Sequence, residues 1–127
     1  MSWIIYFVLF IVLVVVGVYL ALKLHTCNDP DAIHRNVARR LIEKNAFNMI
    51  IDVRTYNEWR GGHHPLGVHI PLMPLNGFRE KIKRLDREGY YLIYCRTGNR
   101  AKQAWKEMKK LGFKNVFFFI GGVNDLI

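Results

Sequence analysis

A chain of 127 residues, of which 51% are hydrophobic, is long enough for one modest core and too short for several large domains. Lys and Arg number 19 against 10 Asp and Glu, so the formal net charge of +9 favours anionic partners such as a lipid surface. Nucleic acid is not expected as a partner, because no basic stripe interleaved with stacking aromatic side chains occurs in the sequence.

The first element in chain order is an uncharged apolar run from Trp3 to Leu22. A helix of this length spans roughly 30 Å, which is the thickness of the hydrocarbon layer of a bilayer. We therefore interpret residues 1–23 as a transmembrane anchor that contacts the membrane through residues 3–22. Residues 24–35 are interpreted as a juxtamembrane linker.

Three alternatives for the apolar run are disfavoured. A cleaved signal peptide needs a basic segment before the run and small residues at its end, and residues 19–21 form a poor cleavage site. A bacterial lipoprotein signal would use Cys27, but His25 and Thr26 stand where small residues are expected. A buried helix of this length in a soluble protein would need a larger surrounding domain than the remaining residues can form.

The basic residues that follow the run predict its orientation. Lys23, Arg35, Arg39 and Arg40 all lie within roughly 20 residues of the span, so the positive-inside rule places the rest of the chain in the cytoplasm. On a helix, Arg35 stacks on Arg39 and Arg40 on Lys44, which gives a basic face. That face could lie on lipid or could simply be solvated, and the sequence leaves both readings open.

Past the linker, helical and strand-like segments alternate. The helices are expected around residues 33–42, over residues 76–89, and after Cys95 until Gly112 stops the last of them. The strands are expected at residues 49–53, 68–72, 90–95 and 115–122, with Pro71 limiting the pairing of the second. These strands are continuous apolar runs, which is typical of a parallel sheet covered by helices on both faces. We therefore predict an α/β fold with an open parallel sheet.

Cys95 stands where the third of these strands turns into a helix. Ligands of open α/β sheets bind beyond the carboxyl ends of the strands, so the thiol occupies an expected site position. The backbone N–H groups of the next residues can surround an anion at the helix N-terminus and favour the nucleophilic thiolate. These residues are Arg96, Thr97, Gly98, Asn99 and Arg100.

Two alternatives for Cys95 are disfavoured. A purely structural role, in which the buried cysteine acts only as a small hydrophobic residue, is less compatible with so polar a turn. A disulfide with Cys27 is disfavoured, because the inferred compartment is reducing.

Four motifs in order, IIDVRTYNEW (50–59), GHHPLGVHIPL (62–72), YYLIYCRTGNRA (90–101) and FIGGV (119–123), resemble a single-domain rhodanese, a sulfurtransferase module. The resemblance implies a five-stranded rhodanese-like sheet in residues 36–127 and a catalytic Cys95 that carries a persulfide. It implies that the loop from Cys95 to Arg100 binds the substrate. Four further positions are expected to support the site through structure rather than acid–base chemistry: Asp52, Arg54, Glu58 and His63.

These residues predict a membrane-anchored sulfurtransferase that moves a sulfur from a donor such as thiosulfate to a thiol or cyanide acceptor. A rhodanese-fold binding module without turnover is the alternative, although a pure binder has no need of the thiol. A phosphatase or arsenate reductase is disfavoured, because related phosphatases read C-x5-R, whereas this loop reads C-x4-R and has Ala101 at the longer spacing. Single-pass anchoring is compatible with a membrane-bound protein partner.

No cofactor and no metal are expected. His63, His64 and His69 are close in sequence, but no cysteine or carboxylate spacing completes a ligand set.

The chain departs from the family pattern at several positions. Leu66 replaces a glycine of the pattern, and His64 replaces an apolar residue. Ala101 replaces a serine, and Val123 replaces an aromatic residue. A final helix normally follows the last strand of the family, so one face of the sheet is expected to be thinly covered in this chain.

Overall fold

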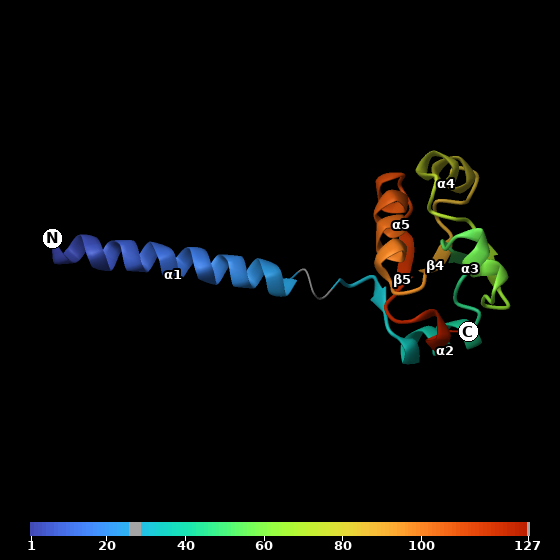
Figure 1. Ribbon diagram of the computed structural model, residues 1–127, viewed down its shortest axis with the longest axis horizontal. Coiled ribbons are helices and arrows are strands. Elements are labelled where there is room, and N and C mark those ends of the chain that lie inside the picture. Colours follow the sequence, from blue (N-terminus) through green and yellow to red (C-terminus); the bar gives the residue numbers. More distant parts are fainter. Residues whose placement is uncertain (26–28, 127) are drawn as a thin grey trace. The chain divides into compact units, whose positions relative to one another are not determined.

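The computed structural model describes residues 1–25 and 29–126. The chain forms two compact units, Met1–Pro30 and Asp31–Ile127, and each is described by itself (Figure 1). Cys27, for which both a lipoprotein signal and a disulfide with Cys95 were considered, lies outside the described residues.

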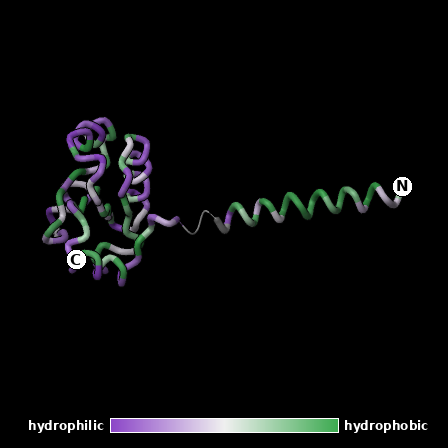
Figure 2. The backbone as a smooth tube through the Cα atoms, turned by 180° about the vertical axis from the view of Figure 1, so that it is seen from behind, coloured by the Kyte–Doolittle hydropathy of each residue, from purple (hydrophilic) through white to green (hydrophobic). Residues whose placement is uncertain are grey.

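The first unit contains one helix, α1 (Ser2–His25). Its sequence is apolar on every side, which is the pattern of a helix with no solvated face (Figure 2). A stretch of 22 residues, Ser2–Lys23, has a mean hydropathy of 3.0. By length and composition, this helix can cross a membrane.

The second unit is built on a five-stranded sheet with the strand order β1-β5-β4-β2-β3, in which every neighbouring pair is parallel. The strands are β1 (Ala32–Ile33), β2 (Met49–Asp52), β3 (Gly67–His69), β4 (Tyr90–Tyr94) and β5 (Asn115–Phe119). In the central pairs, Ile50 lies opposite Leu92, and Leu92 lies opposite Phe117. The predicted α/β fold with an open parallel sheet is therefore confirmed.

Both faces of the sheet are covered. The helices of this unit are α2 (Arg35–Glu43), α3 (Tyr56–Arg60), α4 (Leu75–Ile82) and α5 (Asn99–Lys110), and a 3₁₀ turn, η1, follows at Val123–Asp125. On one face, Ile93 packs in a cluster with buried residues of α4 and α5. On the other face, Leu92 and Tyr94 pack with Ala38 of α2 and with Leu126. Burial of successive strand residues on opposite faces explains why the strands read as continuous apolar runs.

The helix boundaries differ from the sequence prediction at two places. Ile33, expected at the start of a helix, belongs to β1 and pairs with Phe119, and α2 begins only at Arg35. The helix expected over residues 76–89 ends at Ile82, after which Arg84 and Leu85 donate to carbonyl groups three residues back, so the chain tightens into a turn. The predicted stop at Gly112 is confirmed, since this residue follows the C-cap Leu111 and has a φ of +92°.

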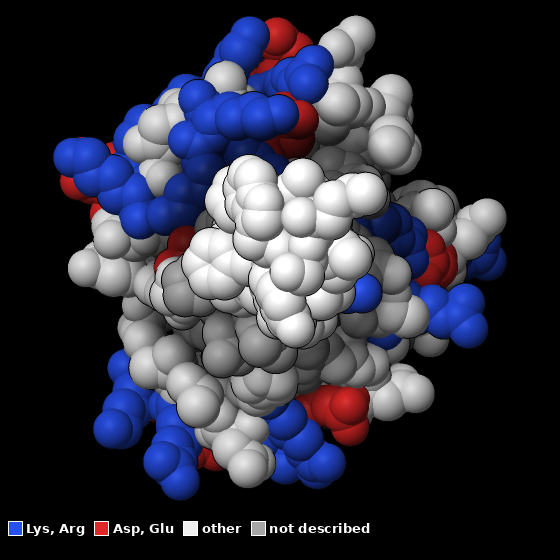
Figure 3. Space-filling model, turned by 90° about the vertical axis from the view of Figure 1, so that its left-hand side faces the viewer, with Lys and Arg blue, Asp and Glu red and all other residues white. Residues whose placement is uncertain are grey.

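The surface of the second unit carries the excess positive charge. Figure 3 shows blue Lys and Arg side chains around the rim of the face it presents, with fewer red Asp and Glu side chains among them. Five of the basic residues belong to α5, whose sequence holds one acidic residue.

Candidate active site

Cys95 directly follows β4 and is only 1% exposed. Its Sγ atom accepts hydrogen bonds from the backbone N–H of Gly98 at 3.0 Å and of Ala101 at 3.4 Å. The second donor belongs to the first turn of α5, so the positive end of that helix is directed at the sulfur. This arrangement stabilises negative charge on the sulfur atom.

The turn around the thiol requires a glycine at position 98. Gly98 has a φ of +102°, in the left-handed region that L-residues rarely adopt. A Cβ atom there would also lie 3.3 Å from the carbonyl oxygen of Phe119, at the end of the neighbouring strand β5. The loop is tied to the chain after β5 by a bond from the N–H of Val123 to the carbonyl oxygen of Arg96. The sheet therefore fixes the path of the loop.

Arg100, the last residue of the loop, is held by Glu58 of α3. Its two terminal nitrogens donate to the two carboxylate oxygens at 2.6 and 2.9 Å. Glu58 also completes a capping box with Thr55, the residue that caps α3. The bond from Arg100 lowers the pKa of Glu58 to about 2, and the bond to Glu58 raises the pKa of Arg100. The pair fixes the guanidinium beside the loop and commits both of its terminal nitrogens to Glu58.

Asp52 and Arg54 form a second ion pair, at the end of β2. Both side chains are buried, and Arg54 donates to the carboxylate through Nε and Nη2 at distances of 2.8 to 3.1 Å. The bond with Asp52 raises the pKa of Arg54. Arg54 Nη2 also donates to the carbonyl oxygen of Gly62 at 2.6 Å. The pair thus connects the end of β2 to the loop that precedes β3.

The histidines at positions 63, 64 and 69 are held by neighbouring groups of the protein, and two of them stack on Trp59. The His63 ring stacks on Trp59 with 4.1 Å between ring centroids, and its Nδ1 donates to the Trp59 carbonyl oxygen at 2.9 Å. The His69 ring lies 5.2 Å from the Trp59 ring, and its Nε2 donates to the carbonyl oxygen of Arg54. His64 is buried, which lowers its pKa, and its Nδ1 accepts the N–H of Leu66. In residues 1–25 and 29–126, no group of His, Cys, Asp or Glu side chains is arranged to hold a metal ion.

A small cleft opens beside the loop. It has a volume of about 140 Å³, and Arg100 is the one charged residue among the described residues that line it. The other lining residues are Val53, Thr55, Pro71, Leu72 and Met73. The walls are therefore mostly apolar, and Arg100 is their charged member.

Sequence reasoning named most of the residues that the fold brings together here. Gly98 of the predicted loop donates to the sulfur atom of Cys95, and Glu58 reaches Arg100 of the same loop from α3. His63 is not part of this group, because its ring and Nδ1 both contact Trp59. The contribution of Ala101 was missed, because a backbone N–H leaves no trace in residue type. The cleft wall at Leu72 and Met73 was also missed, since it depends on how a loop packs.

Comparison with known proteins agrees with this fold. The family model of the rhodanese-like domain matches residues 34–126. The tRNA uridine(34) hydroxylase of Buchnera aphidicola is 31% identical over an alignment of 108 residues that covers 75% of this chain and 32% of the relative. Adenylyltransferase and sulfurtransferase UBA4 of Saccharomyces cerevisiae is 28% identical over an alignment of 109 residues that covers 77% of this chain and 25% of the relative.

The curated relatives are longer proteins, and this chain spans less than half of their length. Among solved structures, the rhodanese-related protein of Thermoplasma volcanium has a TM-score of 0.60 at 29% identity. The similarity covers 72% of this chain and 85% of that one. The match therefore extends over almost a whole single-domain protein.

Proposed function

Because the chain belongs to the rhodanese-like family, we propose that it is a membrane-anchored sulfurtransferase whose Cys95 carries the sulfur as a persulfide. The observation that carries the proposal is the Sγ atom of Cys95, which accepts two backbone N–H groups at the head of α5. A buried cysteine with a purely structural role has no use for donors directed at its sulfur. The name of one relative, a sulfurtransferase, supports the same chemistry.

In the first half-reaction, the Cys95 thiolate attacks the outer sulfur of a donor such as thiosulfate. A new S–S bond forms on Cys95, the S–S bond of the donor breaks, and sulfite leaves with the electron pair. The N–H groups of the loop, from Arg96 to Arg100, stabilise the negative charge of the departing sulfite. Arg96 is exposed and is suited to attract an anionic donor from solution.

In the second half-reaction, a thiolate or cyanide attacks the outer sulfur of the persulfide. The S–S bond to Cys95 breaks and the free thiolate returns, so no external oxidant or reductant is consumed. The persulfide form of the enzyme is the product of the first half-reaction and the reactant of the second, which predicts ping-pong kinetics. Asp52, Arg54 and Glu58 act through structure, because each is committed to an ion pair that holds a loop of the site.

We further propose that α1 anchors the protein by a single pass with the second unit in the cytoplasm. The apolar length of α1 supports the span. The basic residues that follow it, Lys23 and then Arg35, Arg39 and Arg40, support the orientation. In this proposal the connection between the anchor and the catalytic unit ends before Asp31, because Ala32 and Ile33 already form β1 of the sheet. Such an anchor would keep sulfur transfer next to a membrane-bound partner.

The decisive experiment incubates residues 28–127 with thiosulfate and measures the intact mass before and after cyanide or a thiol is added. We expect the mass of one sulfur atom to be gained at Cys95 and then lost to the acceptor, and we expect no gain in Cys95→Ser. A folded protein that gains no sulfur from thiosulfate or from other persulfide donors would refute the enzyme and favour a tethered binding module. Hydrolysis of an aryl phosphate that disappears in Cys95→Ser would instead point to a phosphatase.

A further inference from the structure

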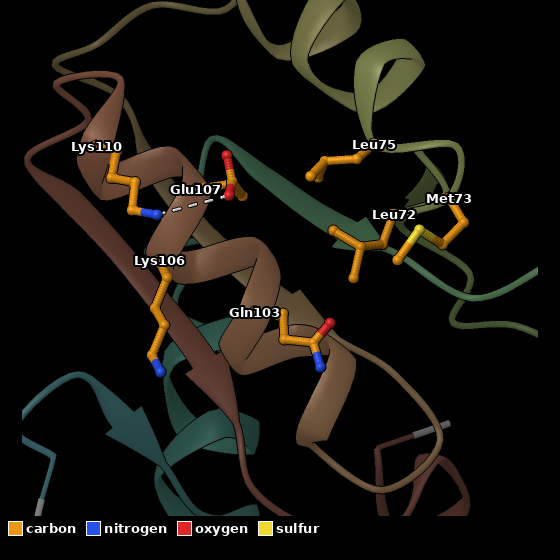
Figure 4. Close-up of a pocket in the computed structure, with 7 residues that line it drawn as sticks. All are labelled: Leu72, Met73, Leu75, Gln103, Lys106, Glu107 and Lys110. Carbon is orange, nitrogen blue, oxygen red and sulfur yellow. Dashed lines mark ion pairs between the residues drawn. The ribbon is translucent and has the colours of Figure 1, made fainter.

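A second hollow adjoins the cleft at the active-site loop. This groove, of about 170 Å³, has an apolar wall made by Leu72, Met73 and Leu75 (Figure 4). The opposite wall is one side of α5 and is made by Gln103, Lys106, Glu107 and Lys110. Leu72 and Met73 also line the cleft that Arg100 borders, so the two hollows share a wall.

The two hollows follow one side of α5. Arg100, Gln103, Glu107 and Lys110 succeed one another at spacings of three and four residues, which places them in a row along the helix. At 1.5 Å per residue the row is about 15 Å long, which is the length of about five residues of extended chain. A small thiol would fill only part of this path.

The groove is positively charged over its polar wall. The carboxylate of Glu107 is bound by Arg79 at 3.0 Å and by Lys110 at 3.8 Å, so its own charge is compensated within the protein. Lys106 and Lys110 are exposed, and Lys106 forms no ion pair with the described part of the chain. Opposite them, Met73 is 64% exposed and presents an apolar surface. An occupant complementary to both walls carries apolar groups on one side and carboxylates on the other.

We propose that this groove binds an extended acidic segment of an acceptor protein and guides the thiol of that segment to Cys95. The proposal rests on the sulfur-transfer function and adds the class of acceptor. The acceptor thiolate attacks the outer sulfur of the Cys95 persulfide, a new S–S bond forms on the acceptor, and Cys95 leaves as the thiolate. The carboxylates of the segment lie against Lys106 and Lys110, and its apolar side chains lie against Met73.

The test measures binding rather than turnover, so its result does not depend on catalysis. The whole chain in uncharged detergent micelles is titrated into two fluorescent peptides of about six residues. Both peptides contain a serine in place of the acceptor cysteine, and one is rich in glutamate while the other is rich in lysine. We expect the glutamate-rich peptide to bind at least about tenfold more tightly, with an affinity that falls as salt is added.

Variants locate the binding site. The double change Lys106→Glu and Lys110→Glu should weaken binding of the glutamate-rich peptide about tenfold, and Met73→Glu, on the other wall, should also weaken it severalfold. Lys102→Glu is the control, because it reverses a single charge on α5 outside the groove and is compared with Lys106→Glu alone, and it should alter binding less than about twofold.

Equal binding of the two peptides, or a loss in Lys102→Glu as large as in the double variant, would overturn the groove as the docking site. Discharge of the persulfide by cyanide, measured on the same variants, reports separately on the proposed function. We expect that reaction to be unchanged in the double variant, since cyanide does not need the groove.

Discussion

The ion pair between Glu58 and Arg100 yields the sharpest prediction, because it joins α3 to the active-site loop. Glu58→Gln removes the charge but keeps an amide oxygen that can serve the capping box with Thr55. The change therefore isolates the electrostatic part of the interaction. We expect it to destabilise the folded state and to leave Arg100 less well fixed beside the loop.

The size of the effect follows from the pKa of Glu58. Its decrease from 4.5 to about 2 corresponds to about 3 kcal/mol at 1.36 kcal/mol per unit. The two side chains are 31% and 27% exposed, so screening by solvent reduces this value. We expect a loss of about 1–2 kcal/mol in the free energy of unfolding at pH 7.

The pH dependence has a definite sign. A carboxylate whose pKa is lowered in the folded state contributes its stability above the unfolded pKa and loses it as the pH falls. The difference between the wild type and Glu58→Gln should therefore be full above about pH 5 and should shrink as the pH falls toward 2.

Urea unfolding of residues 29–127 at several pH values measures this difference, since this segment holds all five strands and both core clusters. Glu80→Gln is the control, because Glu80 pairs with Lys83 on the surface and is 72% exposed. That change should cost less than about 0.5 kcal/mol. A loss in Glu58→Gln no larger than in the control, or one that does not vary between pH 7 and pH 3, would refute the reasoning.

Three further changes test other parts of the structure. Gly98→Ala should lower the free energy of unfolding by about 1–3 kcal/mol, measured with urea, and slow persulfide formation, measured by intact mass. Gly112→Ala is its control, because Gly112 has a similar positive φ and an added Cβ meets no atom within 4 Å, and it should leave sulfur loading unchanged. Asp52→Asn leaves the buried Arg54 without its counter-charge and should lower the free energy of unfolding by about 3–5 kcal/mol; a loss below 1 kcal/mol would show that the pair does not hold the site. Deletion of residues 2–23 should move the protein from the membrane fraction to the soluble fraction of a cell lysate, and a truncated chain that stays with the membrane would show that α1 is not the sole anchor.

Much of the fold could be predicted because its signals are local. The apolar length of α1, the buried runs of β2, β4 and β5, and the glycine after α5 each depend on neighbouring residues. The position of Cys95 at the end of β4 follows from the same patterns, together with the rule that parallel strands present their carboxyl ends at one edge. The strand β1 was not predicted, because its two residues become a strand only by pairing with β5.

Tertiary structure alone decided how the site is assembled. Glu58 and Arg100 are 42 residues apart in sequence, and no local pattern states that their side chains meet. The same holds for the groove, whose walls come from residues 72–75 and from α5. The physical reason is that a periodic pattern fixes which face of an element is buried, whereas the register of the sheet and the packing of its helices fix which distant residues become neighbours.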